Sequence, residues 1–532
     1  MNRIAIYLNK CLDGVVYSAP GILDQYSTDR SLLKIHPRVV ALPENTMDLR
    51  RLVRFSHQLS AKNINLPITV RGSGCSKTGS DIGSGIIVST ERMNAIQEVD
   101  IRQRLVRVQC GVKLGELKKA LGLCGLDLPV FGNPFETIGG LIAKSASASN
   151  NTTPSTIHDF IDRAEVVLSD GSVAEVRALS HHFARRMTNG DKFENEIYEK
   201  VTELIEEERE SIAKIADNKL NRFGYSGLSA VDGKHGFSLV PLICGSEGTL
   251  GIVSEVILRV EPVFESPDYV AIHCKTATIY KQVCDELKRL RFTDAVVYDT
   301  ELFNEIDATG KTSRFFRKVG DDGFLVVANA KDDSLRERKK KFAKLRRALP
   351  DSISIIRQDD SNERDFLELD CILNAYLNES AAGSYHLPLI DGVYIPPENQ
   401  VEFFGKLNEL ADKLKLKLAV FGSVDFNTFS VRPSFKPATA DGRKEIIRFL
   451  AEYLKLISAV EGYPCGEAPE GRFMAIFAKK FEDERTLELY RRVKKIFDPD
   501  GILNPGIKHE TDVHNTLKHF RSDYNQGIEE KQ

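Results

Sequence analysis

Three glycine-rich stretches carry the residues that could bind a large anionic ligand. The first, RGSGCSKTGSDIGSG (71–85), follows a predicted strand and holds five glycines in fifteen residues. Glycine lets successive backbone N–H groups approach an anion closely, which suits a pyrophosphate. The spacing is neither GxxxxGK[ST] nor GxGxxG, and the loop leads into another strand, so a P-loop or a Rossmann site is not expected. Taken alone, the pattern fits a tight strand-to-strand loop equally well.

The other two stretches are TIGGLIAKSASAS (137–149) and GSEGTLGIVSE (245–255). Their glycines permit close approach of a ligand, and their serine and threonine hydroxyls can donate to phosphate or ring polar atoms. Three such loops in one domain favour one large ligand over three unrelated turns.

A fourth stretch, PCGEAPEGRF (464–473), sets two carboxylates and an arginine among glycines and prolines. Glu467 or Glu470 could act as a base if burial raised its pKa toward neutrality. Both could equally be solvated carboxylates or partners of Arg472. Arg472, and Arg432 in VFGSVDFNTFSVRP (420–433), present a guanidinium fork that matches a carboxylate.

Composition bounds the class of protein. A chain of 532 residues with 42% apolar content predicts two or three domains. Its 73 basic and 76 acidic residues nearly cancel, so no nucleic-acid partner is expected. The nine cysteines are scattered, which predicts neither disulfides nor a metal cluster. Without an apolar span of about 18 residues, we expect a cytoplasmic protein with no transmembrane segment.

From about residue 37 the elements that must position these residues follow an α/β pattern. Residues 38–43 read as a strand, 45–63 as an amphipathic helix capped near Asn45 or Thr46, and 66–74 as a strand that runs into the first glycine loop. A charged, helical insertion is expected at about 178–238. A second region of strands and helices begins near residue 266, and a polar, poorly ordered tail is expected from 511.

Five segments together resemble the FAD-linked D-2-hydroxyacid dehydrogenases, the D-lactate dehydrogenase and glycolate oxidase group of the vanillyl-alcohol-oxidase flavoproteins. They are YSTDRS (26–31), the loop at 67–79, TIGGLIA (137–143), GSEGTLGIVSE (245–255) and FDPDGILNPG (497–506). The resemblance implies an α+β fold, with a two-subdomain PCMH-type FAD-binding domain and an α+β cap domain whose antiparallel sheet binds the substrate. The implied boundaries are an N-terminal segment 1–36, the FAD domain 37–263, the cap domain 264–460, a flavin-contacting segment 461–510 and the tail 511–532.

The same resemblance implies FAD as cofactor, held without a covalent bond. No metal is expected, because this chain lacks the histidines that bind one in many members. The residues implied for FAD binding are Arg71, Gly72, Ser73, Gly74, Cys75, Ser76 and Gly79 around the pyrophosphate; Thr137, Gly139, Gly140, Ser145 and Ser147 near the pyrophosphate and ring; Glu247, Gly251 and Ile252 at the ribose and adenine; and Asn504 at the ring.

The sequence departs from this family at its catalytic positions. The family segment SGEHGxGR supplies a histidine as base, and Ala468 occupies that position here. Ser423 and Ser430 stand where many members have metal-binding histidines, and hydroxyls are poor ligands for zinc or manganese. His386 could serve as the base, although a lone histidine is more often structural. The residues singled out for catalysis are Glu467, Arg472, Arg432 and His386.

These features predict an FAD-dependent oxidoreductase that oxidises a 2-hydroxy acid or related alcohol by hydride transfer to flavin N5. The alternative is a flavin-binding protein without 2-hydroxyacid turnover, because the glycine loops persist where three histidines do not. The expected partners are a small-molecule substrate and an unidentified electron acceptor, with a homodimer as one possible assembly.

Overall fold

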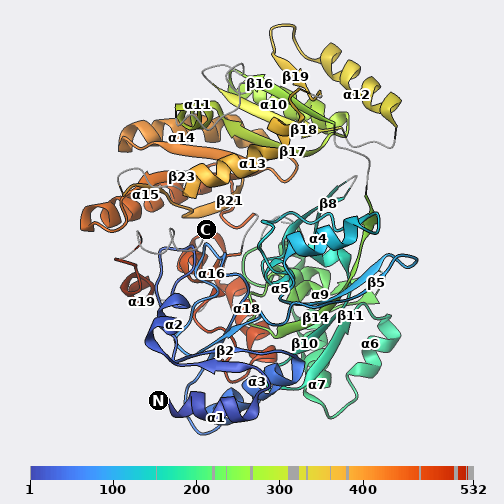
Figure 1. Cartoon of the computed structure of the whole chain (residues 1–532), viewed down its shortest axis with the longest axis vertical. Coiled ribbons are helices and arrows are strands. Elements are labelled where there is room, and N and C mark those ends of the chain that lie inside the picture. The colour runs from blue at the N-terminus through green and yellow to red at the C-terminus, as the bar shows by residue number, and fades with distance from the viewer. Residues whose placement is uncertain are drawn as a thin grey trace. The chain divides into compact units, whose positions relative to one another are not determined.

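The chain folds as two compact units, described here from a computed structural model (Figure 1). Unit 1 comprises Met1–Ala148, Ser155–Val263 and Ala468–Phe520, and unit 2 comprises Ser149–Pro154, Phe264–Glu467 and Arg521–Gln532. The residues that the structure describes are 2–150, 153–217, 222–234, 236–263, 268–308, 323–330, 334–359, 361–378, 383–466, 469–508, 513–522 and 524.

Unit 1 contains two main sheets. The smaller has the order β1-β2-β4-β3, and β4 pairs in parallel with both β2 and β3. The larger has the order β11-β10-β14-β6-β5 and is antiparallel throughout. The strands are β1 Val15–Tyr17, β2 Val39–Leu42, β3 Ile68–Arg71, β4 Ile86–Ser89, β5 Ile96–Asp100, β6 Leu105–Gln109, β10 Ile161–Val167, β11 Val173–Arg177 and β14 Ile252–Arg259.

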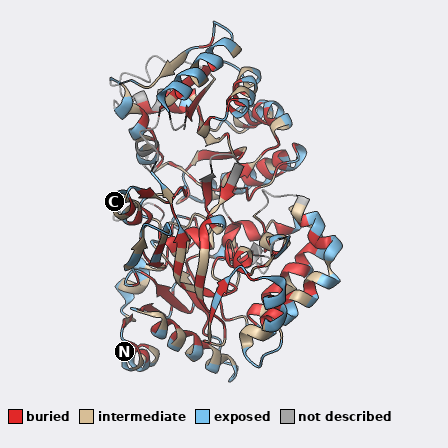
Figure 2. Cartoon of the chain, turned by 90° about the vertical axis from the view of Figure 1, so that its right-hand side faces the viewer, coloured by how far each residue is buried: buried red, intermediate tan, exposed pale blue. Residues whose placement is uncertain are grey.

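Helix α3 (Thr46–Ser60) joins the cores of these two sheets. It begins where predicted, because the Asn45 side chain accepts a hydrogen bond from the backbone N–H of Asp48. Its buried Leu49 belongs to one apolar cluster with Ile86 of the smaller sheet and Val167 of the larger. Burial of each such side chain contributes about 1.5–3 kcal/mol, so the two sheets share a core. Figure 2 shows the buried residues gathered along the strands and the exposed ones on the outer faces of helices.

The helices predicted within 178–238 are present as α6, α7 and α8. The other helices of unit 1 lie around the sheets or return from the C-terminal part of the chain. Its remaining helices are α1 Arg3–Cys11, α2 Pro20–Gln25, α4 Leu114–Gly122, α5 Ile138–Ala143, α9 Val240–Ile243, α16 Gly471–Ala475, α17 Ala478–Phe481, α18 Glu484–Phe497 and α19 Val513–Lys518, and those of the insertion are α6 His181–Met187, α7 Phe193–Glu207 and α8 Arg209–Asp217.

The prediction of an unstructured tail from residue 511 is wrong for its first part. Helix α19 forms there, Phe520 bridges to Leu33, and its ring lies 6.2 Å from that of Phe473. Apolar contacts with residues distant in sequence order this polar segment, and composition does not reveal such contacts.

Unit 2 is built on an eight-stranded antiparallel sheet of order β19-β16-β18-β17-β22-β23-β20, with β21 paired to β23. Helices α11 and α13 pack on one face around Tyr298 and Phe303. Successive side chains of a strand face opposite ways, and α10 and α14 cover the other face through Tyr280, Phe324 and Phe404. The elements are β16 Tyr269–Cys274, α10 Ala277–Arg289, β17 Thr293–Asp299, α11 Thr300–Ala308, β18 Phe324–Asn329, α12 Leu335–Ala348, β19 Ile355–Arg357, α13 Glu363–Asn378, β20 Tyr385–His386, β21 Ile390–Tyr394, α14 Gln400–Leu414, β22 Leu418–Ser423, β23 Thr428–Phe435 and α15 Ala440–Ala459.

The α+β architecture therefore agrees with the fold predicted from the sequence. Among the helices of the described residues, none combines the length and hydropathy that a bilayer crossing requires.

A buried ion pair fixes the segment that follows α18 in unit 1. Lys494 Nζ lies 2.6 Å from Asp498 Oδ2 and also donates to the carbonyl oxygens of Thr249 and Leu503. Asp498 in turn accepts from the backbone N–H groups of Ile502 and Leu503. These bonds fix residues 498–503 to α18, and the Ile68 N–H of β3 donates to the Ile502 carbonyl at 2.8 Å, which joins the segment to the smaller sheet.

We expect Lys494→Met to lower the free energy of unfolding by about 3–5 kcal/mol, because it leaves the Asp498 carboxylate buried without its cation. The measurement is chemical denaturation followed by circular dichroism. Lys495→Met is the matched control, since Lys495 is the exposed neighbour on the same helix. Equal stability of the two variants would contradict a stabilising role for the buried pair.

Candidate functional site

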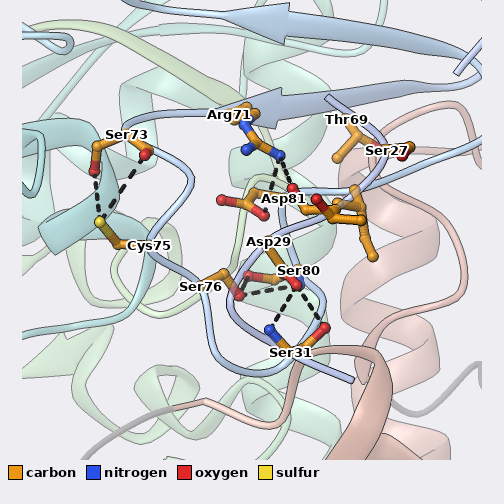
Figure 3. A network of polar contacts seen from close by, with 12 residues as sticks. Ser27, Asp29, Ser31, Thr69, Arg71, Ser73, Cys75, Ser76, Ser80 and Asp81 are labelled. Carbon is orange, nitrogen blue, oxygen red and sulfur yellow. Dashed lines mark hydrogen bonds and ion pairs between the residues drawn. The ribbon is translucent and has the colours of Figure 1, made fainter. Parts of the chain in front are cut away.

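The first glycine loop connects β3 to β4 and presents unsatisfied backbone donors. None of the five consecutive backbone N–H groups of residues 72–76 donates a hydrogen bond to another described residue. Gly74 and Gly79 have φ angles of +71° and +78°. Ser73 Oγ lies 3.3 Å from Cys75 Sγ in the same loop (Figure 3). A run of free N–H groups in a concave loop is an anion-binding arrangement, so the loop fits the FAD pyrophosphate implied by the sequence.

Glycine is required in this loop by its neighbours as well as by its dihedral angles. A Cβ on Gly72 would lie 2.3 Å from Thr137 Oγ1, and one on Gly74 would lie 2.4 Å from Arg71 Nη2. The loop therefore packs directly on the second stretch and on the Arg71 side chain. Arg71 itself is buried and donates to the Thr28 carbonyl oxygen at 2.8 Å, so the structure places its guanidinium against the loop and the N-terminal segment.

The second stretch forms the short helix α5 and the strand-like segment after it. Thr137 caps α5 by accepting from the Gly140 N–H at 3.2 Å. Gly139 N donates to the Cys110 carbonyl at 2.7 Å, where a side chain would collide. Ser145 has a φ of +52°, and the Ser147 hydroxyl accepts from Arg222 Nη2 at 2.9 Å.

The third stretch lies against the end of α5. Gly245 N donates to the Ile142 carbonyl at 2.9 Å, and Glu247 N donates to the Ala143 carbonyl at 3.1 Å. Gly251 sits where a Cβ would lie 2.5 Å from Val166 Cγ1, and Ile252 begins β14 as a buried residue. The stretches that the sequence predicted to share one ligand are thus neighbours in unit 1.

The side chain of Asn504 ties these stretches together. Its Nδ2 donates to the carbonyl oxygens of Ser80 and Glu247, both at 2.8 Å. Its Oδ1 accepts from Thr69 Oγ1 at 3.1 Å and from Arg472 Nη2 at 3.3 Å. Asn504 is buried and has a φ of +44°, a conformation that asparagine tolerates better than most residues. Its amide therefore fixes the spacing between the first and third stretches.

A fully buried charge cluster lies beside Asn504, and the sequence interpretation did not include its lysine. Lys508 Nζ is 3.2 Å from Glu247 Oε2 and 3.3 Å from Glu470 Oε2. Glu470 also accepts from the Gly224 N–H. Burial raises the pKa of Glu247, an effect that the neighbouring Lys508 opposes and the Glu470 charge reinforces. Glu247 Oε1 is buried and has no hydrogen-bond partner among the described residues, so it is available to a bound group.

Arg472 is occupied by protein oxygens. Its Nε and Nη2 donate to the Ile82 carbonyl at 3.1 and 2.9 Å, and its Nη1 donates to the Pro505 carbonyl at 2.7 Å. Burial lowers the pKa of Arg472 to about 10. The sequence predicted that the Arg472 guanidinium could bind a substrate carboxylate. In the structure it joins α16 to the first loop and to the C-terminal segment.

Arg432 lies on β23 of unit 2 and is also paired. Its Nε and Nη2 donate to Asp391 Oδ1 and Oδ2 at 3.2 and 2.8 Å, and both side chains are buried. The Phe421 ring lies 5.0 Å from the guanidinium carbon. Asp391 was not singled out from the sequence, because nothing in the local pattern LIDGVY marks it as the partner of an arginine 41 residues away.

His386 lies on β20, the strand next to β23. Its Nδ1 is 3.3 Å from the Arg432 carbonyl oxygen, and its ring lies 5.4 Å from that of Tyr376. A carbonyl can only accept, so Nδ1 is the donor in this contact.

The serines at the family's histidine positions make local backbone contacts. Ser430 Oγ accepts from the Gly392 N–H at 3.2 Å, and Ser423 Oγ accepts from the Phe426 N–H at 3.4 Å. Within the described ranges, no group of three histidine, cysteine, aspartate or glutamate side chains could hold a metal ion. Glu467 and Ala468 lie outside the described residues.

Two family models match this chain. One, described as an FAD binding domain, matches residues 37–177, and the other, described as the C-terminal domain of FAD linked oxidases, matches residues 297–507. Together they match parts of both units.

The chain is similar to curated dehydrogenases over most of its length. It is 26% identical to D-2-hydroxyglutarate dehydrogenase of Pantoea ananatis, over 90% of this chain and 48% of that protein. It is 24% identical to D-lactate dehydrogenase of Archaeoglobus fulgidus, over 91% of this chain and 95% of that one. The chain thus spans about half the length of the D-2-hydroxyglutarate dehydrogenases it matches.

Solved structures share the fold. The 4-ethylphenol oxidase from Gulosibacter chungangensis matches with a TM-score of 0.70 at 14% identity, covering 96% of this chain and 98% of that one. An alkyldihydroxyacetonephosphate synthase matches with a TM-score of 0.60 at 16% identity, covering 92% and 82%. At these identities the likeness concerns the fold alone.

We expect Gly74→Ala to weaken FAD binding about tenfold or more, because a left-handed φ costs a non-glycine residue about 1–2 kcal/mol and the new methyl group meets Arg71. FAD titration of the apoprotein by flavin fluorescence measures the effect. Gly122→Ala is the control, since a Cβ there has nothing within 4 Å. Unchanged affinity in Gly74→Ala would show that the loop does not hold the cofactor.

Proposed function

The chain belongs to the FAD-linked oxidase family, and we propose that it binds FAD without a covalent bond and oxidises a 2-hydroxy acid or a related alcohol. The observation that carries the proposal is the row of free backbone N–H groups at residues 72–76. Hydrogen bonds join the three other motif segments, 137–149, 245–255 and 497–506, to one another around this loop. The similarity to a D-2-hydroxyglutarate dehydrogenase and a D-lactate dehydrogenase also supports the proposal.

In this proposal the residues of unit 1 bind and orient the cofactor. The N–H groups of residues 72–76 hold the pyrophosphate, while Asn504 and Arg472 keep the loop and the C-terminal segment in register. Bound FAD supplies a hydride acceptor at N5. The orphaned Glu247 Oε1 is a further polar contact for the bound group, in keeping with the cofactor role predicted for Glu247.

His386 is our proposed base. The family base position holds Ala468, so another group must take the hydroxyl proton. The Arg432 carbonyl accepts from Nδ1 of His386, so in the neutral ring Nε2 is the nitrogen that can take a proton. Glu467 stays a sequence-based alternative for this role.

The pairing of Arg432 with Asp391 bears on the substrate class. A guanidinium already bound by a carboxylate forms a neutral pair and attracts a second carboxylate less strongly than a free one. We therefore include neutral alcohols beside 2-hydroxy acids among the proposed substrates.

A second candidate function is flavin binding without turnover, in a binding or regulatory role. Its support is that Ala468, Ser423 and Ser430 together replace three imidazoles while the glycine loops persist. Selection for FAD binding alone would produce that pattern.

The two functions differ in one measurement. We expect the flavin absorbance near 450 nm to bleach when FAD-loaded protein is mixed anaerobically with at least one member of a panel of D- and L-2-hydroxy acids and neutral secondary alcohols. The control is the same panel with free FAD. Bleaching by no member would favour the binding-only function.

We expect His386→Ala to slow bleaching by the active substrate about 10²–10⁴-fold, the usual contribution of a positioned base. His386→Gln tests the role separately, since glutamine keeps polarity but accepts no proton at neutral pH. In His386→Ala, a second change Ala468→His places an imidazole at the family position and should restore part of the rate. A wild-type rate and pH profile in His386→Gln would exclude His386 as the base.

A further inference from the structure

One buried carboxylate oxygen of unit 1 has no hydrogen-bond donor, although the other oxygen of the same side chain has two. Glu247 Oε2 lies 3.2 Å from Lys508 Nζ and accepts from the Gly471 N–H at 3.2 Å. Glu247 Oε1 is buried and has no hydrogen-bond partner among the described residues. The side chain is only 3% exposed, so bulk solvent does not supply the missing donor. A buried acceptor that lacks a donor is costly, and a bound ligand can supply one.

Lys508 holds two buried carboxylates that differ in this respect. Its side chain is fully buried, and its Nζ also lies 3.3 Å from Glu470 Oε2. Both oxygens of Glu470 accept from the Gly224 N–H, at 3.0 and 3.2 Å. The protein therefore satisfies Glu470 completely and leaves one oxygen of Glu247 without a donor.

The backbone at this cluster is strained. Glu247, Asn504 and Lys508 have φ angles of +53°, +44° and +61°, in the left-handed region that disfavours residues with a Cβ. The Asn504 Nδ2 donates to the Glu247 carbonyl at 2.8 Å, and Glu247 in turn pairs with Lys508. Strain of this kind persists where surrounding bonds over-determine it, and it gathers at ligand sites.

The cluster is attached to the loop that is proposed to bind FAD. A Cβ on Gly471, whose N–H bonds to Glu247, would lie 2.3 Å from Thr78 Oγ1 of that loop. The Thr78 carbonyl accepts from the Arg472 N–H at 2.9 Å. Asn504 Nδ2 also donates to the Ser80 carbonyl of the same loop at 2.8 Å. The oxygen without a donor is thus part of the structure that fixes the loop.

We infer that Glu247 Oε1 accepts a hydrogen bond from FAD and that Lys508 is the positioning residue that keeps this oxygen an acceptor. The inference rests on the proposed FAD binding. FAD carries hydroxyl and ring N–H donors, and Oε1 is the oxygen that Lys508 and the Gly471 N–H leave for them. Burial raises the pKa of Glu247 and Lys508 opposes that rise, so the lysine favours the ionised carboxylate, which only accepts.

Replacement of the carboxylate by an amide reverses the polarity of the free position. In Glu247→Gln the amide oxygen turns toward Lys508 and the Gly471 N–H, which are both donors, so the NH₂ group takes the place of Oε1. A donor of FAD then meets a second donor, and we expect the dissociation constant of FAD to rise about tenfold or more. Titration of the apoprotein by flavin fluorescence measures it.

Glu470→Gln is the matched control, because it removes the same charge from the same lysine. Its amide oxygen can accept from both Gly224 and Lys508, so the affinity for FAD should stay near that of the wild type. Equal losses in the two variants, or unchanged affinity in Glu247→Gln, would overturn the inference. Failure of the wild-type protein to bind FAD would instead overturn the proposed function, and the inference with it.

The positioning role is tested by Lys508→Met in the Glu470→Gln background, where one carboxylate instead of two loses its cation. The Gly471 N–H still occupies Oε2, so the buried Glu247 takes a proton on Oε1, which becomes a donor. We expect FAD to bind about tenfold more weakly than to Glu470→Gln alone. Unchanged affinity would overturn the role of Lys508.

A third change, Glu247→Gln, separates positioning from general loosening of the fold. Because the acceptor is already lost in the Lys508→Met variant, the added change should cost little further affinity. Losses that simply add would overturn the role of Lys508, since they would show that it does not act through Glu247. Circular dichroism of each apoprotein verifies the fold, and either comparison decides if a variant of the other does not fold.

Discussion

The hydrogen bonds of the Asn504 side chain are the contact on which the candidate cofactor site depends. One buried amide uses two donors on the backbone of Ser80 and Glu247 and two acceptor positions toward Thr69 and Arg472. An aspartate lacks the donors and a leucine lacks both, and the left-handed φ of this residue excludes most other side chains. The asparagine of FDPDGILNPG is thus explained by geometry that joins chain segments more than 250 residues apart.

Buried charge surrounds this contact. Lys508 lies between Glu247 and Glu470, and Arg71 and Arg472 lie near Asp29 and Asp81. Backbone N–H groups, which carry no net charge, are suited to receive a phosphate in such surroundings.

In unit 2, the serines at the positions predicted to hold histidines in the family bond to the backbone. Ser423 Oγ accepts from the Phe426 N–H within the β22–β23 hairpin, and Ser430 Oγ accepts from the Gly392 N–H of the neighbouring β21. Asn427 takes the left-handed turn position where the family has glycine, with a φ of +53°. Asp391 forms an ion pair with Arg432, which the sequence predicted could bind a substrate carboxylate.

The sequence by itself determined helix α3 with its Asn45 cap, the helical insertion and the glycine loops, because periodicity, capping and left-handed turns are local properties. The fold class followed from the resemblance of its motifs to a known family. The sequence also identified the stretches that meet in unit 1. Only the tertiary structure decided what Arg71, Arg432 and Arg472 bind, because each guanidinium donates to acceptors that are distant in sequence. Lys508 and Asp391 could not be found locally, because a buried charge is recognised only when its partner is known. Contacts made across the fold likewise ordered α19, which its polar composition did not predict.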